Sequence, residues 1–192
     1  MKVVLLNSTP LEVADLAIGK CWDKQCDTVN KERMKRVGIK FKHASTLEHI
    51  TYNFDIDGIS RACLQELARH RISSFSVKST RYTLKEVREH EGCLDEFLVK
   101  TGNPYIEQFN LIQLLDLQKV LRSGISNDEA KYMIPEAFKT SLVWTINLRA
   151  LRNFLQLRLS KSALWEIRDL ANEILKVIPN EHMFLFEDLI DE

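Results

Sequence analysis

Residues 50–82 read ITYNFDIDGISRACLQELARHRISSFSVKSTRY, and the spacing of the apolar side chains changes twice along this stretch. Between residues 50 and 57, apolar and polar side chains alternate, which indicates a strand with one buried face. Gly58 ends this strand, and Ser60 can cap the helix that follows. The Ser-, Thr- and aromatic-rich segment 73–82 favours extended backbone or a loop. The stretch therefore predicts a strand, a helix and an extended segment in direct succession.

Helical spacing dominates the rest of the chain. Helices are predicted at residues 11–21, 31–37, 59–70, 106–122, 127–132, 147–159, 162–177 and 183–189, and glycines are expected to end two of them, at Gly38 and Gly124. A short strand is predicted at 3–6, and residues 138–146 fit a strand or a helix. No repeat, low-complexity tract or linker divides the chain. The sequence thus predicts the α+β class: a helix-rich single domain, residues 1–192, around a small, mostly antiparallel sheet.

The composition is that of a globular protein, since 45% of the 192 residues are hydrophobic. No apolar stretch approaches the ~20 residues needed to cross a bilayer, and the first residues are too short for a signal-peptide core. We therefore expect a cytoplasmic protein with no membrane partner. Twenty-seven basic and 27 acidic side chains cancel, which argues against binding nucleic acid through an overall positive field. The four cysteines form no CxxC pair and are expected to be free thiols: Cys21, Cys26, Cys63 and Cys93.

Familiar nucleotide and metal motifs are absent from the sequence, which contains no GxGxxG, Walker, HExxH or GxSxG pattern. His90 and His182 have no partner at metal-ligand spacing, and no metal site is expected. If the chain binds nucleotides, their phosphates must be held by arginine, lysine and serine side chains or by helix ends.

The densest polar feature is the segment 69–82, where the predicted helix gives way to extended backbone. It contains four cations, Arg69, Arg71, Lys78 and Arg81, and five serine or threonine hydroxyls. Arginine can bind a phosphate through two parallel hydrogen bonds, and the hydroxyls add donors, so the segment suits an anion pocket. Two alternatives stay open on the residues alone. Arg69 and Arg71 could complement the dipole of a helix C-terminus, or the segment could bind nucleic acid.

Three motifs in this sequence resemble those of the flavin-dependent thymidylate synthases, the thymidylate synthase complementing protein family. The first is Arg69-His70-Arg71, followed after seven residues by Ser79 and then by Thr80-Arg81-Tyr82. The second is HASTLEH at 43–49, and the third is NLRALRNFLQLR at 147–158. The three occur in the order typical of the family and cover roughly residues 40 to 170, so chance is a poor explanation.

The resemblance implies a homotetramer that binds FAD at the junctions between subunits. The residues that would bind FAD are Ser45, Arg69, His70, Arg71, Val77, Asn147, Arg149 and Asn153. The residues that would bind the substrate, dUMP, are Glu66, Arg69, Lys78, Ser79, Arg81, Lys131 and Arg158. The implied activity is reductive methylation of dUMP to dTMP, with methylenetetrahydrofolate as the carbon donor and NADPH or NADH as the reductant of FAD. NADPH and methylenetetrahydrofolate are thus expected as co-substrates.

On this resemblance, Arg158 is the expected catalytic residue. Its fixed positive charge at the pyrimidine edge would favour ionisation of the ring imide and make the ring a better carbon nucleophile. Ser79 is expected to bind rather than to attack, because the sequence offers it no evident base. Helical spacing places two FAD residues, Arg149 and Asn153, on one face of the helix. A second face, facing uracil, would carry Asn147, Leu151, Phe154 and Arg158.

Three positions depart from the family pattern. Glu66 stands where a glutamine is usual, Val77 where an acidic residue is common, and Ser162 where a histidine is common. At Val77 any contact would be reduced to the backbone. The departures at Val77 and Ser162 keep open a further alternative, a family member without catalytic activity that stores flavin or has a structural role.

Overall fold

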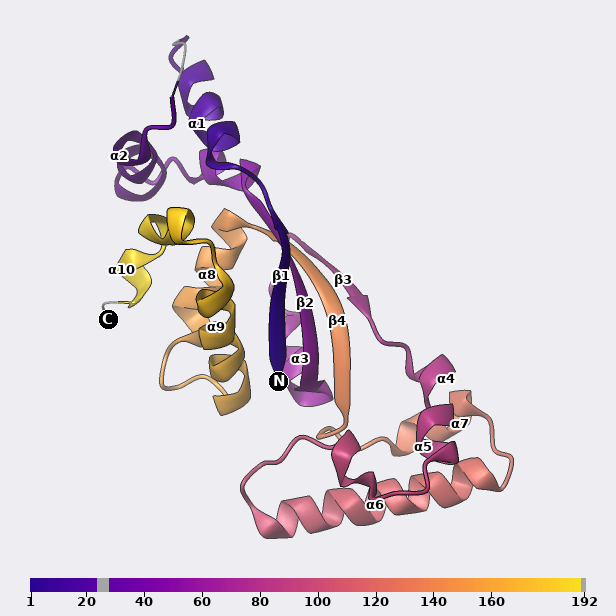
Figure 1. The fold of residues 1–192 in the computed structure, drawn as a ribbon. Helices are drawn as coiled ribbons and strands as arrows, with labels where there is room; N and C mark the ends of the chain where they lie inside the picture. The colour runs from indigo at the N-terminus through magenta and orange to yellow at the C-terminus, as the bar shows by residue number, and fades with distance from the viewer. Residues whose placement is uncertain (24–27, 191–192) are drawn as a thin grey trace.

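A computed structural model describes residues 1–23 and 28–190. Within these residues four strands form one antiparallel sheet in the order β1-β2-β4-β3 (Figure 1). The strands are β1 (Lys2–Ser8), β2 (Thr51–Ser60), β3 (Ser73–Val77) and β4 (Lys139–Asn147). The predicted α+β class and antiparallel sheet are confirmed, and the ambiguous segment 138–146 is a strand.

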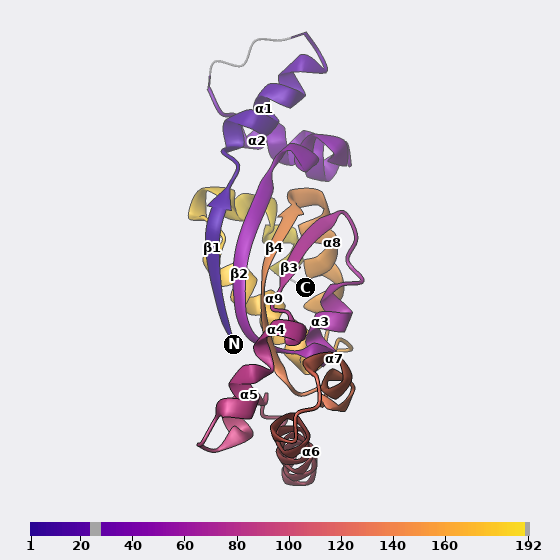
Figure 2. The same ribbon diagram turned by 90° about the vertical axis from the view of Figure 1, so that its right-hand side faces the viewer.

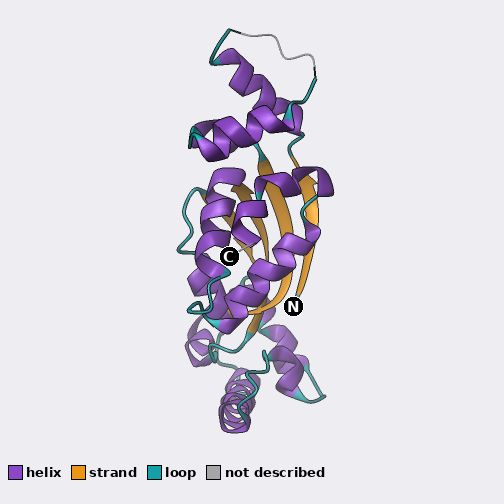
Figure 3. Cartoon of the chain, turned by 90° about the vertical axis from the view of Figure 1, so that its left-hand side faces the viewer, coloured by secondary structure: helices purple, strands orange, loops and turns teal. Residues whose placement is uncertain are grey.

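Two helices, α8 (Leu148–Arg158) and α9 (Trp165–Val177), cover one face of the sheet (Figures 2 and 3). The buried residues of β2 and β4 alternate toward this face, as the period of two predicts for β2. Phe54 on β2 pairs directly with Trp144 on β4, and Phe75 on β3 pairs with Trp144 from the other side. The Trp144 ring lies edge-on to Phe154 of α8, with 5.2 Å between ring centroids. An aromatic core therefore connects the sheet to the helix that carries Arg158.

Most of the other helices form two groups beyond the two ends of the sheet (Figure 1). At one end lie α1 (Leu11–Lys20), α2 (Lys31–Met34), the π-helical η1 (Lys35–Lys40) and the 3-10 helix η2 (Ala44–His49). At the other end lie α4 (Thr80–Thr83), α5 (Lys85–Glu89), η3 (Leu94–Phe97), α6 (Pro104–Arg122), α7 (Asn127–Ala130) and η4 (Lys131–Met133). This second group has a hydrophobic cluster of its own, which includes Leu114, Leu117 and Leu121 of α6. None of the helices described is long and apolar enough to span a bilayer.

Several predicted boundaries are wrong. Gly58 does not end β2, which continues to Ser60 past an irregularity in its pairing with β4 between Asp57 and Ile59, and the helix expected from 59 begins only at Arg61. The helix that begins at Lys31 does not end at Gly38 but continues as η1 to Lys40. Gly38 is buried there, and a Cβ atom at this position would lie 2.5 Å from Leu47 Cδ2, so the glycine serves close packing rather than termination. The helix expected from Ser162 begins only at Trp165.

Three of the four cysteines lie in the described residues, and Cys21, Cys63 and Cys93 are free thiols, as predicted. Cys26 lies outside the described residues.

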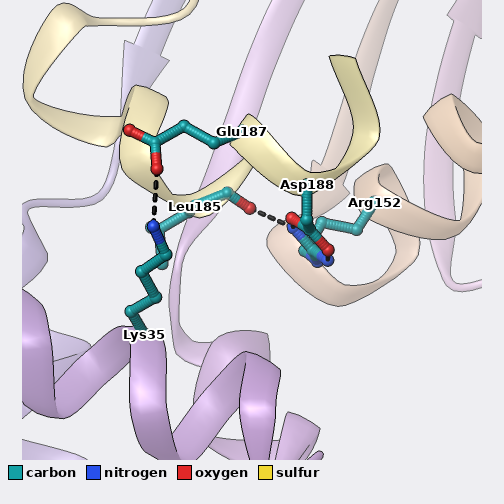
Figure 4. A network of polar contacts seen from close by, with 5 residues as sticks. All are labelled: Lys35, Arg152, Leu185, Glu187 and Asp188. Carbon is teal, nitrogen blue, oxygen red and sulfur yellow. Dashed lines mark hydrogen bonds and ion pairs between the residues drawn. The ribbon is translucent and has the colours of Figure 1, made fainter. Parts of the chain in front are cut away.

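The C-terminal segment is attached to the rest of the fold by charged contacts (Figure 4). In α10 (Glu187–Ile190), the carboxylate of Asp188 accepts hydrogen bonds of 2.9 and 2.6 Å from the two terminal nitrogens of Arg152. Arg152 also donates to the carbonyl of Leu185, and Lys35 of η1 pairs with Glu187 at 2.6 Å. Residues 185–188 therefore connect α8 to the helices at one end of the sheet.

Replacing Asp188 with asparagine is expected to lower the free energy of unfolding at pH 7 by roughly 0.5–1 kcal/mol, because the pair is partly exposed. Arg152 holds the pKa of Asp188 below its ordinary value of 3.8. Protonation is thus harder in the folded state, so the pair stabilises the fold above about pH 4 and loses its effect as pH falls through the lower folded-state pKa. Urea unfolding of both proteins between pH 7 and pH 3 measures this difference.

Asp169→Asn is the matched control for this measurement, because Asp169 is exposed on α9 and forms no ion pair with the part of the chain described. A stability difference for Asp188→Asn that equals the control, or that does not shrink toward pH 3, would contradict the assigned pair.

Candidate active site

The segment with the Arg-His-Arg triplet follows directly from α3 (Arg61–Leu67). Ser60 caps this helix, as predicted: its hydroxyl accepts a hydrogen bond of 2.9 Å from the Cys63 amide and donates to the buried carboxylate of Glu166. The triplet, residues 69–71, comes after the last turn. Ile72 then adopts a φ of +63° before β3 begins. This left-handed conformation costs a β-branched residue about 1–2 kcal/mol, and such strain concentrates at functional sites.

Arg158, at the last turn of α8, lies against the end of α3. Its Nε donates a hydrogen bond of 2.9 Å to His70 Nε2, and its Nη1 pairs with a Glu66 carboxylate oxygen at 2.9 Å. Its Nη2 lies 3.4 Å from the Glu66 carbonyl oxygen. A guanidinium group has five N–H donors, so these three contacts leave two for a ligand. The structure thus brings together three residues predicted for the site, Glu66, His70 and Arg158.

The side chain of His70 is buried between Arg158 and the core. Its ring packs edge-on against Phe154, with 4.9 Å between centroids. Burial and the neighbouring Arg158 lower the pKa of His70 to about 4, which Glu66 opposes and Arg69 reinforces. The ring is therefore neutral near pH 7. Because Arg158 can only donate, Nε2 carries the lone pair and Nδ1 the hydrogen.

Three further predicted cations form ion pairs within the chain. Lys78 pairs with Glu86 at 2.6 Å, and Arg149 pairs with Glu48 of the 43–49 motif at 2.7 Å. Arg81 makes two hydrogen bonds to Asp128, of 2.7 and 2.9 Å. In contrast, three cations have no carboxylate partner within residues 1–23 and 28–190: Arg69, Arg71 and Lys131. These three remain available to neutralise a bound anion.

The other predicted site residues occupy more exposed positions. Ser45 lies on η2, and Asn153 lies on the solvent side of α8 near Arg149. Asn147 caps α8, and its side-chain oxygen accepts a hydrogen bond from the Ala150 amide. Val77 ends β3, and Ser79 precedes α4.

One predicted face of α8 needs correction. Leu151 and Phe154, expected to line the uracil side, are fully buried in the core, and only Arg158 of that face reaches the site. Arg149 and Arg158 lie at opposite ends of α8, about 14 Å apart along a helix with a rise of 1.5 Å per residue. Within a single chain, therefore, the predicted FAD-binding residue Arg149 does not lie next to the predicted dUMP-binding residue Arg158.

The sequence did not reveal the residues that hold the predicted site residues in place through hydrogen bonds. Asp128 and Asn127 fix Arg81 from α7, since Asn127 also donates a hydrogen bond of 2.7 Å to the Arg81 carbonyl. The only local signal was the capping box of α7, in which Ser126 bonds with Glu129. That pattern predicts where a helix begins, but it does not predict that the helix contacts Arg81.

Comparison with known proteins places the chain in a family. The family model described as thymidylate synthase complementing protein matches residues 4–182. A flavin-dependent thymidylate synthase of Campylobacter jejuni (strain RM1221) is 52% identical over 97% of this chain and 96% of its own length. The enzyme of the same name from Helicobacter pylori (strain ATCC 700392 / 26695) is 45% identical over 99% of both chains.

A solved structure agrees with these relatives. The crystal structure of thymidylate synthase X from Helicobacter pylori with FAD and dUMP superposes with a TM-score of 0.94, at 43% sequence identity and with both chains fully covered. The geometry around Arg158 and the matches along almost the whole sequence lead to one conclusion: the chain belongs to the thymidylate synthase complementing protein family, the flavin-dependent thymidylate synthases.

Proposed function

We propose that this flavin-dependent thymidylate synthase binds dUMP against FAD where Arg158, Glu66 and the triplet Arg69–Arg71 meet. The chain is a methyltransferase that converts dUMP to dTMP with FAD as its cofactor. The observation that carries the proposed site is the contact of Arg158 with both Glu66 and His70. It joins two of the three sequence motifs through side chains.

The residues fit a flavin nucleotide. FAD combines a pyrophosphate with a largely apolar ring system. Arg69 and Arg71 are exposed, two positions apart and without a carboxylate partner within the described chain, so they can bind its anionic part. Arg149 and Asn153 share an exposed face of α8, and Ser45 and the side-chain nitrogen of Asn147 lie on neighbouring elements. When bound, FAD supplies the hydride that completes the methyl group.

Arg158 supplies a positive charge to the pyrimidine. Its side chain is only 17% exposed, so its charge is screened less than that of a surface arginine. Two N–H groups remain for the pyrimidine edge, and their charge stabilises the ionised imide. Glu66 holds the guanidinium in place, but its carboxylate also offsets part of that charge. Glu66 therefore positions Arg158 and weakens the effect of its charge on the pyrimidine.

The dUMP phosphate is proposed to lie near α4 and η4. Arg81 is fixed there by Asp128, while Lys131 at the start of η4 has no carboxylate partner among the residues described. Ser79 and Lys78 precede Arg81 and add donors. No hydrogen bond joins the Ser79 hydroxyl to a base in the described residues, which supports binding rather than nucleophilic attack.

A homotetramer in the cytoplasm, built from single catalytic domains of residues 1–192, is proposed as the active form. The separation of Arg149 from Arg158 supports pockets completed by neighbouring chains. Exposed apolar side chains also flank the site, including Ile72 at 73% and Tyr82 at 70%. Methylenetetrahydrofolate and NADPH are the proposed co-substrates, and nucleic acid is not a proposed partner.

The purified protein is expected to show flavin absorbance and to make dTMP only when dUMP, methylenetetrahydrofolate and NADPH are all supplied. Chromatographic detection of dTMP, with each component omitted in turn, measures this dependence. Yellow protein that never forms dTMP would instead favour a flavin store. Colourless protein that cannot take up FAD but binds DNA in a salt-sensitive manner would favour a nucleic-acid-binding protein.

A further inference from the structure

We propose that His70 is a positioning residue for Arg158: its imidazole accepts the hydrogen bond that fixes the direction of the guanidinium group. The inference rests on the proposed function, because Arg158 is the group placed at the pyrimidine. It goes beyond the resemblance, which implies only that His70 contacts FAD.

His70 is well placed to transmit the rigidity of the core. Its ring packs edge-on against Phe154, which is fully buried and itself packs edge-on against Trp144 of β4. The backbone is fixed as well, since the His70 amide donates to the Leu67 carbonyl at 3.0 Å and Ser73 Oγ donates to the His70 carbonyl at 2.8 Å. The acceptor atom Nε2 is therefore held in one place, 2.9 Å from Arg158 Nε.

The hydrogen bond requires a neutral ring, because a protonated imidazole has no acceptor and would repel the guanidinium. The charged groups that influence the ring are Arg158 from α8, Glu66 from α3 and Arg69 from the triplet. Together with burial they keep the pKa of His70 near 4, so the acceptor is present at neutral pH. In this tautomer Nδ1–H has no acceptor among the residues described and stays available to a ligand.

His70 and Glu66 hold different parts of the guanidinium group. Glu66 contacts the two Nη atoms, whereas within residues 1–23 and 28–190 only His70 contacts Nε. Without the Nε contact, the planar group can turn about its terminal torsions while still paired to Glu66. A reacting group displaced by about 1 Å can cost roughly 100-fold in rate, so this orientation should affect turnover more than substrate binding.

Two substitutions distinguish the role of the hydrogen-bond acceptor from the role of the aromatic ring. His70→Phe keeps the ring and its packing against Phe154 but has no acceptor, whereas His70→Gln loses the ring but keeps an acceptor oxygen at similar reach. We expect His70→Phe to lower kcat at least about tenfold with a smaller change in KM for dUMP. His70→Gln should recover a clear part of that loss. A kcat for His70→Phe within about twofold of the unchanged protein would overturn the inference.

A spectroscopic measurement tests the hydrogen bond without turnover. Nitrogen chemical shifts of 15N-labelled histidine in the full-length protein should show His70 as the neutral tautomer with hydrogen on Nδ1 from pH 8 to pH 5. Hydrogen on Nε2, or titration near the ordinary value of 6.5, would overturn the inference. If the expected tautomer is found but the protein neither binds dUMP nor forms dTMP, the proposed function fails while the His70–Arg158 contact stands.

Discussion

Replacing Arg158 with alanine is expected to lower kcat/KM for dUMP at least about 100-fold, which is typical for loss of a group that stabilises charge in a transition state. The side chain is only 17% exposed, and two of its N–H groups have no partner in the described part of the chain, so its charge acts on a bound pyrimidine with little screening. Its partner Glu66 is 35% exposed and can be solvated once the arginine is removed. The loss should therefore appear in turnover and not in folding.

Steady-state rates of dTMP formation and thermal unfolding of the same preparations measure this difference. Arg158→Lys keeps the charge but not the planar fork, so it should recover only a small part of the rate. Arg168→Ala is a matched control, because the side chain of Arg168 on α9 bonds only to the Lys161 carbonyl in the part of the chain described and has no proposed role. A rate for Arg158→Ala within threefold of this control, at equal flavin content, would refute the catalytic assignment.

Replacing Arg71 with alanine is expected to weaken FAD binding by roughly 10- to 100-fold, because a hydrogen bond to a charged group contributes about 1.5–3 kcal/mol. Arg71 is exposed and has no carboxylate partner in the described chain, so its removal takes no ion pair from the fold. The free energy of unfolding of the cofactor-free protein should therefore be the same with and without the substitution. Titration of FAD into cofactor-free protein, followed by flavin fluorescence, measures the dissociation constant.

Arg61→Ala is the matched control for Arg71, since Arg61 begins α3 while the triplet follows the end of the same helix. Arg71→Lys should give an intermediate affinity, because lysine keeps the charge without two parallel donors. If Arg71→Ala binds FAD as tightly as Arg61→Ala but turns over poorly, the roles assigned to Arg71 and Arg158 would have to be exchanged.

Periodic patterns in the sequence predicted most of the fold, and the exceptions have physical reasons. The alternation at 50–57 predicted β2 because its outward residues are polar. At β4 the same alternation is blurred by Val143, an apolar side chain on the outward face that is 38% exposed. The role of Gly38 depends on Leu47, and contacts between separate elements leave no trace in spacing.

The candidate site shows even more clearly that sequence patterns do not reveal contacts between separate elements. An anion pocket at 69–82 follows from the density of cations, but its connection to Arg158 spans 88 positions and came only from family resemblance. Glu48 lies in the 43–49 motif and Asp128 at the start of α7, but neither position indicates which arginine predicted for the site it pairs with. Residue types indicated the ligand chemistry, while the fold determined which cations remain unpaired.

Titration of the purified yellow protein with dUMP, followed by the visible absorbance of its flavin, tests most directly whether the two ligands share one pocket at Arg158. We expect dUMP to perturb the flavin spectrum in a saturable manner, and Arg158→Ala to weaken or abolish this response. A flavin spectrum that does not change while dUMP binds, or a response that is unaltered in Arg158→Ala, would contradict a shared pocket at Arg158.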